Sequence, residues 1–203
     1  MATGLQITGR TNTEQFDFYD TPAWATELVL KYILKDGILT KDDDIYEPCS
    51  GAGAIVDVLD VMQFTNVRAS DIQTADYIVG EKGINVFDMQ SNSCDVIFTN
   101  PPYNLMTRKE IHGGSMLKDF LRIANKKVIL LLNIFFLSSH ERNELIKKSH
   151  LRHVYIHSDR VTMYKHGAEK PSNDGMKMFT WCVFDNEYDG TTTMSNISKK
   201  DVF

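Results

Sequence analysis

The stretch DIYEPCSGAGAIVDVL, residues 44–59, joins a short apolar segment, a glycine-rich turn and an amphipathic segment. The apolar residues before Glu47 are typical of a buried strand, and residues 54–62 repeat apolar side chains with helical spacing. Gly51 and Gly53 allow a tight turn and let a ligand approach the backbone closely. A strand, a glycine-rich turn and a helix form the first unit of a doubly wound sheet, in which Glu47 offers a carboxylate at the strand end.

Two glycines alone are a weak signal for a ligand site. Ala54 and Ile55 stand where a third glycine of the dinucleotide fingerprint could follow, so a purely structural turn stays an alternative at this point.

Strand-like and helical patterns alternate along the chain, which predicts an α/β fold with a mostly parallel sheet covered by helices on both faces. Thr21 and Pro22 mark a helix start, with threonine as the cap and proline in the first turn. No crossover helix fits between the last two strands, so they should pair antiparallel. The expected strands are residues 45–47, 67–70, 96–99, 128–133, 153–157 and 178–184, and the expected helices are residues 22–34, 54–62, 116–124 and 138–149.

The composition fits one domain over residues 1–203, with 42% hydrophobic and 24% charged residues. Residues 1–15 and 186–203 lack apolar anchors and are expected to be loose tails. The chain has no apolar stretch of membrane-spanning length and no CxxC pair among its three cysteines, so we expect a cytoplasmic protein without a membrane partner, disulfide framework or metal site. His150, His153 and His157 cross from a helix end into a strand and should not share a face.

The net charge of −5 argues against a surface that binds nucleic acid everywhere, although a local basic groove remains compatible with it. Lysine and arginine gather in three places, each of which could also be ordinary solvated charge. These places are Arg108 with Lys109, Lys147 and Lys148 with Arg152, and Arg160, Lys165 and Lys170 in one loop.

Acidic residues follow two later strand-like segments. Asp71 ends VRASDIQ about where a nucleotide-binding sheet places the acid that contacts ribose hydroxyls, although a polar strand cap would look the same. Asp88 follows in GINVFDMQ and could accept a hydrogen bond from an adenine amino group, although taken alone it is a loop acid.

The segment DVIFTNPPYN, residues 95–104, ends a buried strand with an amide, two prolines and a tyrosine. Pro101 and Pro102 stiffen the turn and remove two backbone donors, so nearby carbonyls need partners from elsewhere. The Asn100 side-chain carbonyl and the Pro101 carbonyl could accept the two N–H bonds of a planar amine, with Tyr103 stacked on its ring. A merely rigid turn is the alternative.

NPPY after an apolar strand, preceded by EPCSGAG and FYDTPAWATELVL, resembles the S-adenosylmethionine-dependent amino-methyltransferases, above all the DNA adenine N6 enzymes. MKMFTWCVFD is similar to their late strand, and the resemblance covers about residues 16–185. It implies the Rossmann-like, seven-stranded methyltransferase variant of the doubly wound sheet.

The resemblance also implies site residues. Catalysis would use Asn100, Pro101, Pro102 and Tyr103, and the target would contact Tyr103, Arg108 and Lys109. The S-adenosylmethionine site would comprise Tyr19, Thr21, Pro22, Glu47, Pro48, Gly51, Gly53, Asp71, Ile72, Asp88 and Asn100.

The expected function is methylation of the adenine N6 amino group in DNA, after the base has flipped out of the duplex. An RNA adenine N6 or protein glutamine methyltransferase is the alternative, and a non-catalytic cofactor-binding subunit is a third. No segment has room for a target-recognition domain, so we expect a short or relaxed target sequence, or recognition by a partner subunit or second copy. The small size suggests a stand-alone modification enzyme of a bacterium or phage, of the restriction-modification kind.

Overall fold

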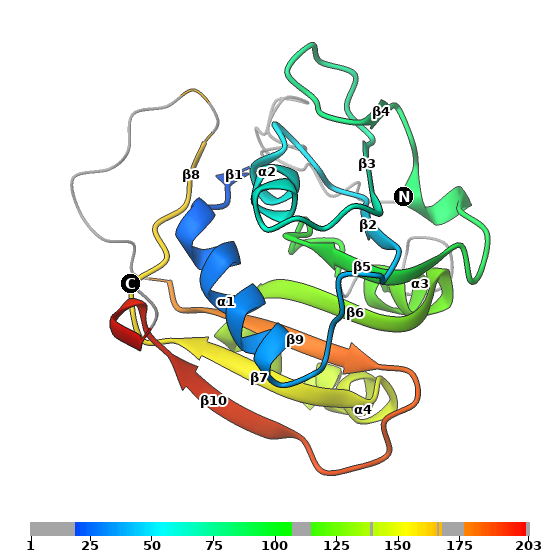
Figure 1. The fold of residues 1–203 in the computed structure, drawn as a ribbon. Coiled ribbons are helices and arrows are strands. Elements are labelled where there is room, and N and C mark those ends of the chain that lie inside the picture. Colours follow the sequence, from blue (N-terminus) through cyan, green and yellow to red (C-terminus); the bar gives the residue numbers. More distant parts are fainter. Residues whose placement is uncertain (1–18, 107–114, 139, 166, 168–176, 202–203) are drawn as a thin grey trace, which may run out of the picture.

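The computed structural model describes residues 19–106, 115–138, 140–165, 167 and 177–201. One eight-stranded sheet forms the centre of the molecule, with the strand order β10-β7-β9-β6-β5-β2-β3-β4 (Figure 1). The strand order reverses at β2, which pairs with β3 on one side and with β5 on the other. Ligands bind at such a switch point in open α/β sheets, outside the carboxyl ends of the strands.

The strands of this sheet are all parallel except one. Strand β9 runs antiparallel to both of its neighbours, β6 and β7, which confirms the predicted pairing of the last two expected strands. The sheet comprises β2 (Ile45–Glu47), β3 (Val67–Asp71), β4 (Glu81–Lys82), β5 (Cys94–Thr99), β6 (Ala124–Asn133), β7 (Leu151–His157), β9 (Phe179–Asp185) and β10 (Thr193–Ile197).

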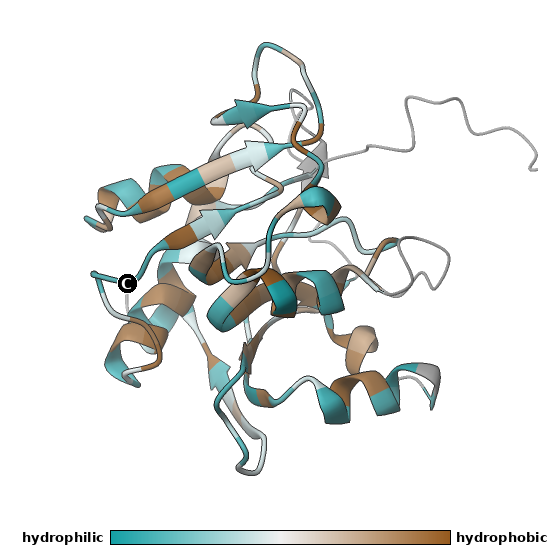
Figure 2. Cartoon of the chain, turned by 90° about the vertical axis from the view of Figure 1, so that its right-hand side faces the viewer, coloured by the Kyte–Doolittle hydropathy of each residue, from teal (hydrophilic) through white to brown (hydrophobic). Residues whose placement is uncertain are grey.

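The helices cover both faces of the sheet, as the alternating pattern predicts. They are α1 (Ala23–Lys35), α2 (Ala54–Val61), α3 (Met116–Ile123) and α4 (His140–Lys148), with short 3-10 helices at η2 (Val86–Asp88), η3 (Ile134–Leu137) and η4 (Lys199–Asp201). None of the helices in the described part of the chain has the length and apolar character needed to cross a bilayer. Figure 2 shows hydrophobic and hydrophilic residues alternating along these helices.

Successive residues of the central strands serve opposite cores, because side chains alternate across a strand. In β6, Ile129 and Leu131 pack with α1 and α2, whereas Val128 and Leu130 pack with α3. All four side chains are fully buried. This double burial explains why β6 reads as a continuous apolar run.

A second, two-stranded sheet lies beside the carboxyl ends of the large one. It pairs β1 (Tyr19–Asp20) antiparallel with β8 (Tyr164–Lys165), two segments that are far apart in the sequence (Figure 1). Both strands are too short to leave an alternating pattern, and the sequence did not predict them.

The expectation of a loose C-terminal tail is wrong for residues 186–201. Strand β10 pairs parallel with β7 from Thr193 to Ile197, and Ile197 is fully buried in the core beneath α1. The sheet has eight strands instead of the expected seven, and β4 and β10 are the two strands beyond the six expected from the sequence pattern. The other residues of β10 face solvent at a sheet edge, which is why its composition looks like that of a tail. Residues 1–15 lie outside the described part of the chain.

The start of α1 also differs from the expectation. Pro22 is the N-cap residue and the helix begins at Ala23, and no side chain caps its first turn. The Thr21 hydroxyl instead accepts a hydrogen bond from the Asn100 side chain, 3.1 Å away. Thr21 therefore lines a pocket instead of capping the helix.

Candidate active site

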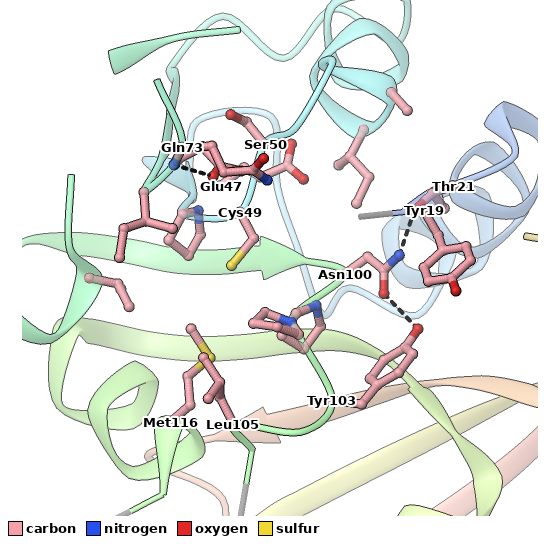
Figure 3. A pocket seen from close by; sticks show the side chains of 18 of the residues that line it. Tyr19, Thr21, Glu47, Cys49, Ser50, Gln73, Asn100, Tyr103, Leu105 and Met116 are labelled. Atoms are coloured by element: carbon pink, nitrogen blue, oxygen red, sulfur yellow. Dashed lines mark hydrogen bonds between the residues drawn. The ribbon is translucent and has the colours of Figure 1, made fainter. Parts of the chain in front are cut away.

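One pocket of about 510 Å³ opens at the carboxyl ends of β2 and β5, at the switch point of the sheet. Most of its residues come from the segment before α1, the turn after β2, the loops after β3 and β5, and the segment around η2, and Met116, Met163 and Lys177 come from other parts of the chain. Figure 3 shows the pocket with Glu47 and Ser50 toward one end and Asn100 and Tyr103 toward the other.

The glycine-rich turn forms the first end of the pocket. Gly53 has a left-handed backbone (φ 85°), and a Cβ atom at this position would lie 2.8 Å from a methyl carbon of Val79. The Gly51 N–H donates to a carboxylate oxygen of Asp71 at 3.0 Å, and the Ser50 hydroxyl donates to the Val79 carbonyl at 2.6 Å. These two hydrogen bonds hold the turn against β3 and the loop that follows β3. The Cys49 and Ser50 side chains of the turn face the pocket.

Glu47 contributes a buried carboxylate to this end. Its side chain is 1% exposed, and its Oε2 atom has no hydrogen-bond partner among the described residues. Burial raises the pKa of Glu47 well above its ordinary value, and the nearby carboxylates of Asp71 and Asp57 raise it further. A buried carboxylate with one unpartnered oxygen in a cavity suits a cationic ligand group, because an unpaired buried charge is costly.

Asn100 forms the centre of the second end. Its Nδ2 atom donates to the Thr21 hydroxyl at 3.1 Å, and its Oδ1 atom accepts from the Tyr103 hydroxyl at 2.6 Å (Figure 3). The sulfur atom of Met163 lies 3.8 Å from Nδ2 and 3.7 Å from the Tyr103 hydroxyl. The amide is therefore held by side chains from three segments.

Tyr103 is held by its hydroxyl contacts and by a ring contact with Phe179. Burial raises the pKa of this phenol, so it stays protonated and can donate a hydrogen bond. Its ring lies 6.0 Å from the ring of Phe179, with an angle of 35° between the planes. Leu105 and Met116 line the neighbouring wall of the pocket and give it an apolar side (Figure 3).

The structure brings most of the predicted site residues together. The pocket is lined by Tyr19, Thr21, Glu47, Pro48, Asp71, Ile72, Asn100, Pro101, Pro102 and Tyr103. Gly51 and Gly53 do not line it but form the turn beside it, and Pro22 lies at the helix start behind Thr21.

Asp88 does not line the pocket. Its carboxylate accepts a hydrogen bond from the Asn85 side chain at 3.0 Å, while Asn85, Val86 and Phe87 from the same segment face the cavity. The segment forms the 3-10 helix η2 and not the end of a strand. This helix directs Val86 and Phe87 to the pocket and leaves Asp88 outside it. Arg108 and Lys109 lie outside the described residues.

Several lining residues were not predicted from the sequence. Cys49, Ser50 and Gln73 neighbour predicted residues and could have been found by adjacency, whereas Met116, Met163 and Lys177 carry no local signal of a site. Burial raises the pKa of the Cys49 thiol, which argues for packing and against nucleophilic chemistry.

The three histidines considered as metal ligands have separate environments. His153 bonds to the hydroxyls of Thr193 and Ser195, and His150 contacts the Tyr188 carbonyl. His157 packs edge-on against Trp24, 5.4 Å between ring centres. Within the described part of the chain, no cluster of three or more histidine, cysteine or acidic residues could hold a metal ion.

Comparison with solved structures confirms the fold class. The chain resembles a "putative RNA methyltransferase" from Pyrococcus horikoshii at 13% identity and a TM-score of 0.61, over 88% of this chain and 90% of that one. It resembles the magnesium protoporphyrin IX methyltransferase from Synechocystis PCC 6803, solved with bound S-adenosylmethionine, at 13% identity and a TM-score of 0.51, over 87% of this chain and 86% of that one.

A third similar structure is longer. The methyltransferase subunit of a type I restriction-modification system from Streptococcus thermophilus matches at 11% identity and a TM-score of 0.56, over 89% of this chain and 48% of that one. No protein-family model and no curated protein matches the sequence. At these identities the likenesses show the fold alone, which is the Rossmann-like methyltransferase fold.

Proposed function

We propose that this protein transfers a methyl group from S-adenosylmethionine to the N6 amino group of adenine in DNA. The observation that carries the proposal is the placement of Glu47 and Asn100 in one pocket at the switch point of the sheet. Glu47 offers an anion where a cationic cofactor would bind, and Asn100 offers an amide oxygen where a planar amine would bind.

The residues at the glycine-rich end fit S-adenosylmethionine. The buried Glu47 oxygen without a partner suits the ammonium group of the cofactor, and Asp71 at the end of β3 suits ribose hydroxyls. Ile72, Val86 and Phe87 would enclose the adenine ring, with Tyr19 and Thr21 beside the methionine part. When bound, the cofactor supplies an activated methyl group on a sulfonium sulfur.

The NPPY end fits the amine that receives the methyl group. Asn100 Oδ1 and the Pro101 carbonyl would each accept one amino proton, which shifts electron density toward the amino nitrogen. Pro101 and Pro102 cannot donate backbone hydrogen bonds, so they leave these acceptors to the substrate. The bound cofactor would supply the methyl group and keep the carbon–sulfur electron pair on its sulfur as a neutral thioether, and one proton of the methylated amine would leave to solvent. Alignment of the two reactants supplies most of the catalysis.

Adenine in a duplex would have to flip out to reach Asn100, because Asn100 lines a pocket of about 510 Å³ that cannot hold a duplex. The ring of Tyr103 and the apolar side chains of Leu105 and Met116 would replace part of the lost stacking. Lys177 is exposed at the pocket and places a positive charge where a phosphate backbone would pass.

Recognition of a target sequence needs further contacts. We propose that residues 104–115 and 159–175, which lie largely outside the described part of the chain, supply them, or that a partner subunit or a second copy does. The chain spans 48% of the type I methyltransferase subunit that it resembles, which is consistent with a requirement for additional recognition elements.

Methylation of RNA adenine or of a protein glutamine is the second candidate. It is supported by the same acceptor pair, because a glutamine amide and an adenine amino group are both planar amines. A non-catalytic cofactor-binding subunit is less well supported, since Asn100 keeps its hydrogen bonds inside an open pocket.

Labelled S-adenosylmethionine offered with duplex DNA, single-stranded DNA, RNA or protein tests the proposal. Mass spectrometry of the products should find N6-methyladenine in DNA, and methylation of only another polymer would contradict it. Asn100→Ala should abolish turnover while cofactor binding persists. Asn125→Ala, at an exposed position on β6, is the matched control and should keep full activity.

A further inference from the structure

The Asn100 amide is fixed on both sides by hydroxyl groups from different segments. Thr21, before α1, receives the Nδ2 hydrogen bond at 3.1 Å, and Tyr103 donates to Oδ1 at 2.6 Å. The Thr21 side chain is 5% exposed, so its contact with Asn100 is shielded from solvent. A rotation of the amide by 180° would exchange its donor and acceptor and remove the acceptor from a substrate amine.

Met163 favours the observed orientation of this amide. Its thioether sulfur can only accept a hydrogen bond, and it lies 3.8 Å from Nδ2. The NH₂ group of Asn100 therefore faces two acceptors, Thr21 and Met163, while its oxygen faces the phenolic donor of Tyr103. A carbonyl oxygen has two lone pairs, so Oδ1 can accept from Tyr103 and still accept one proton from a substrate.

We propose that the hydroxyl groups of Thr21 and Tyr103 are positioning residues that fix the Asn100 amide with its oxygen directed to the target amine. This inference rests on the proposed methyl transfer. It adds a role of the Tyr103 hydroxyl to the stacking proposed for its ring. It also gives Thr21 a role at the target end of the pocket, in addition to its place near the cofactor.

Hydroxyl-deleting variants separate this role from stacking. Tyr103→Phe keeps the ring and removes the donor, and Thr21→Val keeps the shape and removes the acceptor. Each should lower kcat by about tenfold or more, because a small misplacement of a catalytic group is costly, with KM for the polymer changed much less. Thr21→Ser should restore most of the loss, since it retains the hydroxyl.

Two matched controls come from the same fold. Tyr46→Phe removes a buried phenol that bonds to Ser70 at 2.5 Å outside the pocket, so it should leave kcat unchanged. Thr26→Val removes a buried hydroxyl without a hydrogen-bond partner among the described residues, so it should be neutral. The double variant of Thr21→Val and Tyr103→Phe should lose less than the product of the single losses, because both groups hold one amide. A wild-type kcat in Tyr103→Phe would overturn the proposal.

Nuclear magnetic resonance of the side-chain amides gives a test that does not need turnover. The Asn100 NH₂ signals, identified by their loss in Asn100→Ala, should shift in Thr21→Val and in Tyr103→Phe. Signals that neither variant shifts would overturn this proposal even if the chain methylates DNA. If they shift as expected and no polymer is methylated, the proposed function fails while the fixed amide stands.

Discussion

The carboxylate of Asp71, at the end of β3, accepts a hydrogen bond from the Gly51 backbone N–H over 3.0 Å. The other carboxylate oxygen accepts from the Gln73 N–H at 2.8 Å. One buried side chain thus holds both the glycine-rich turn and the start of the next loop, which are two walls of the pocket. Its role in the fold cannot be separated from its expected role in binding the cofactor.

Asp71→Ala should weaken both stability and cofactor binding. The Gly51 N–H would lose its partner in a buried position, which costs about 1–3 kcal/mol in the free energy of unfolding. Urea unfolding measures this loss, and calorimetric titration with S-adenosylmethionine should show at least about tenfold weaker binding. Asp76→Ala, at a fully exposed side chain, is the control and should change stability by less than about 0.5 kcal/mol. Equal effects of the two variants would contradict this role.

Gly53→Ala should be more damaging than Gly37→Ala, although both glycines have left-handed backbones. A side chain in this conformation costs about 1–2 kcal/mol at either position. At Gly53 the new Cβ would also lie 2.8 Å from a Val79 methyl carbon, whereas at Gly37 it would meet nothing within 4 Å. Thermal unfolding should therefore show a lower Tm for Gly53→Ala, and only this variant should lose affinity for S-adenosylmethionine. A similar Tm for both variants would show that Val79 moves freely.

The central fold was predictable because its strands and helices carry strong periodic patterns. Strands β2, β3, β5, β6, β7 and β9 appear within a few residues of their expected bounds, and so do all four α-helices. The elements that the sequence did not predict, β1, β4, β8 and β10, have few buried side chains or only two residues. Their strand geometry comes from pairing with distant segments and not from local pattern.

The pocket was predictable where its residues directly follow strands. Glu47, Asp71 and Asn100 each stand at or just after the end of a parallel strand, and such ends meet at one edge of the sheet. Met163 could not be found this way, because it reaches Asn100 from a loop more than sixty residues away. The sequence also could not predict that Asp88 lies outside the pocket, because the chain forms a 3-10 helix there.

Binding of S-adenosylmethionine should release a proton from Glu47. Burial raises the pKa of this carboxyl, so above its ordinary value of 4.5 the folded protein without cofactor holds a proton that the unfolded chain has lost. Stability of the free protein should therefore fall as the pH rises above 4.5. An ammonium group beside Glu47 favours the carboxylate, so affinity should rise as the pH rises above 4.5 through the raised pKa of Glu47, while the cofactor amine is still protonated.

Calorimetry in two buffers of different ionisation enthalpy counts the released protons. Glu47→Gln cannot release one, so its binding should be weaker and nearly independent of pH in this window. The same proton release in wild type and Glu47→Gln would show that another group titrates.

His157 should make the protein less stable in acid. It is 6% exposed on β7, and neither ring nitrogen has a hydrogen-bond partner among the described residues. Burial lowers the pKa of His157 from 6.5 to about 4; Lys199 lowers it further, and Asp159 opposes the shift. Between these two pH values His157 is protonated in the unfolded chain but neutral in the folded chain. Stability therefore falls as the pH drops from 6.5 toward 4.

The full effect is about 3 kcal/mol in the free energy of unfolding, because one pKa unit corresponds to about 1.4 kcal/mol. His157→Leu should remove this part of the pH dependence and should be at least as stable as wild type in acid, since it deletes two buried polar atoms without partners. Urea unfolding at about pH 7 and at about pH 5 should show about 2 kcal/mol of this loss, because the full effect is reached only below about pH 4. His140→Leu, at an exposed position on α4, should keep the wild-type dependence. If His157→Leu retains the same loss in acid, the acid sensitivity arises from other groups, because the imidazole that this variant lacks cannot supply it.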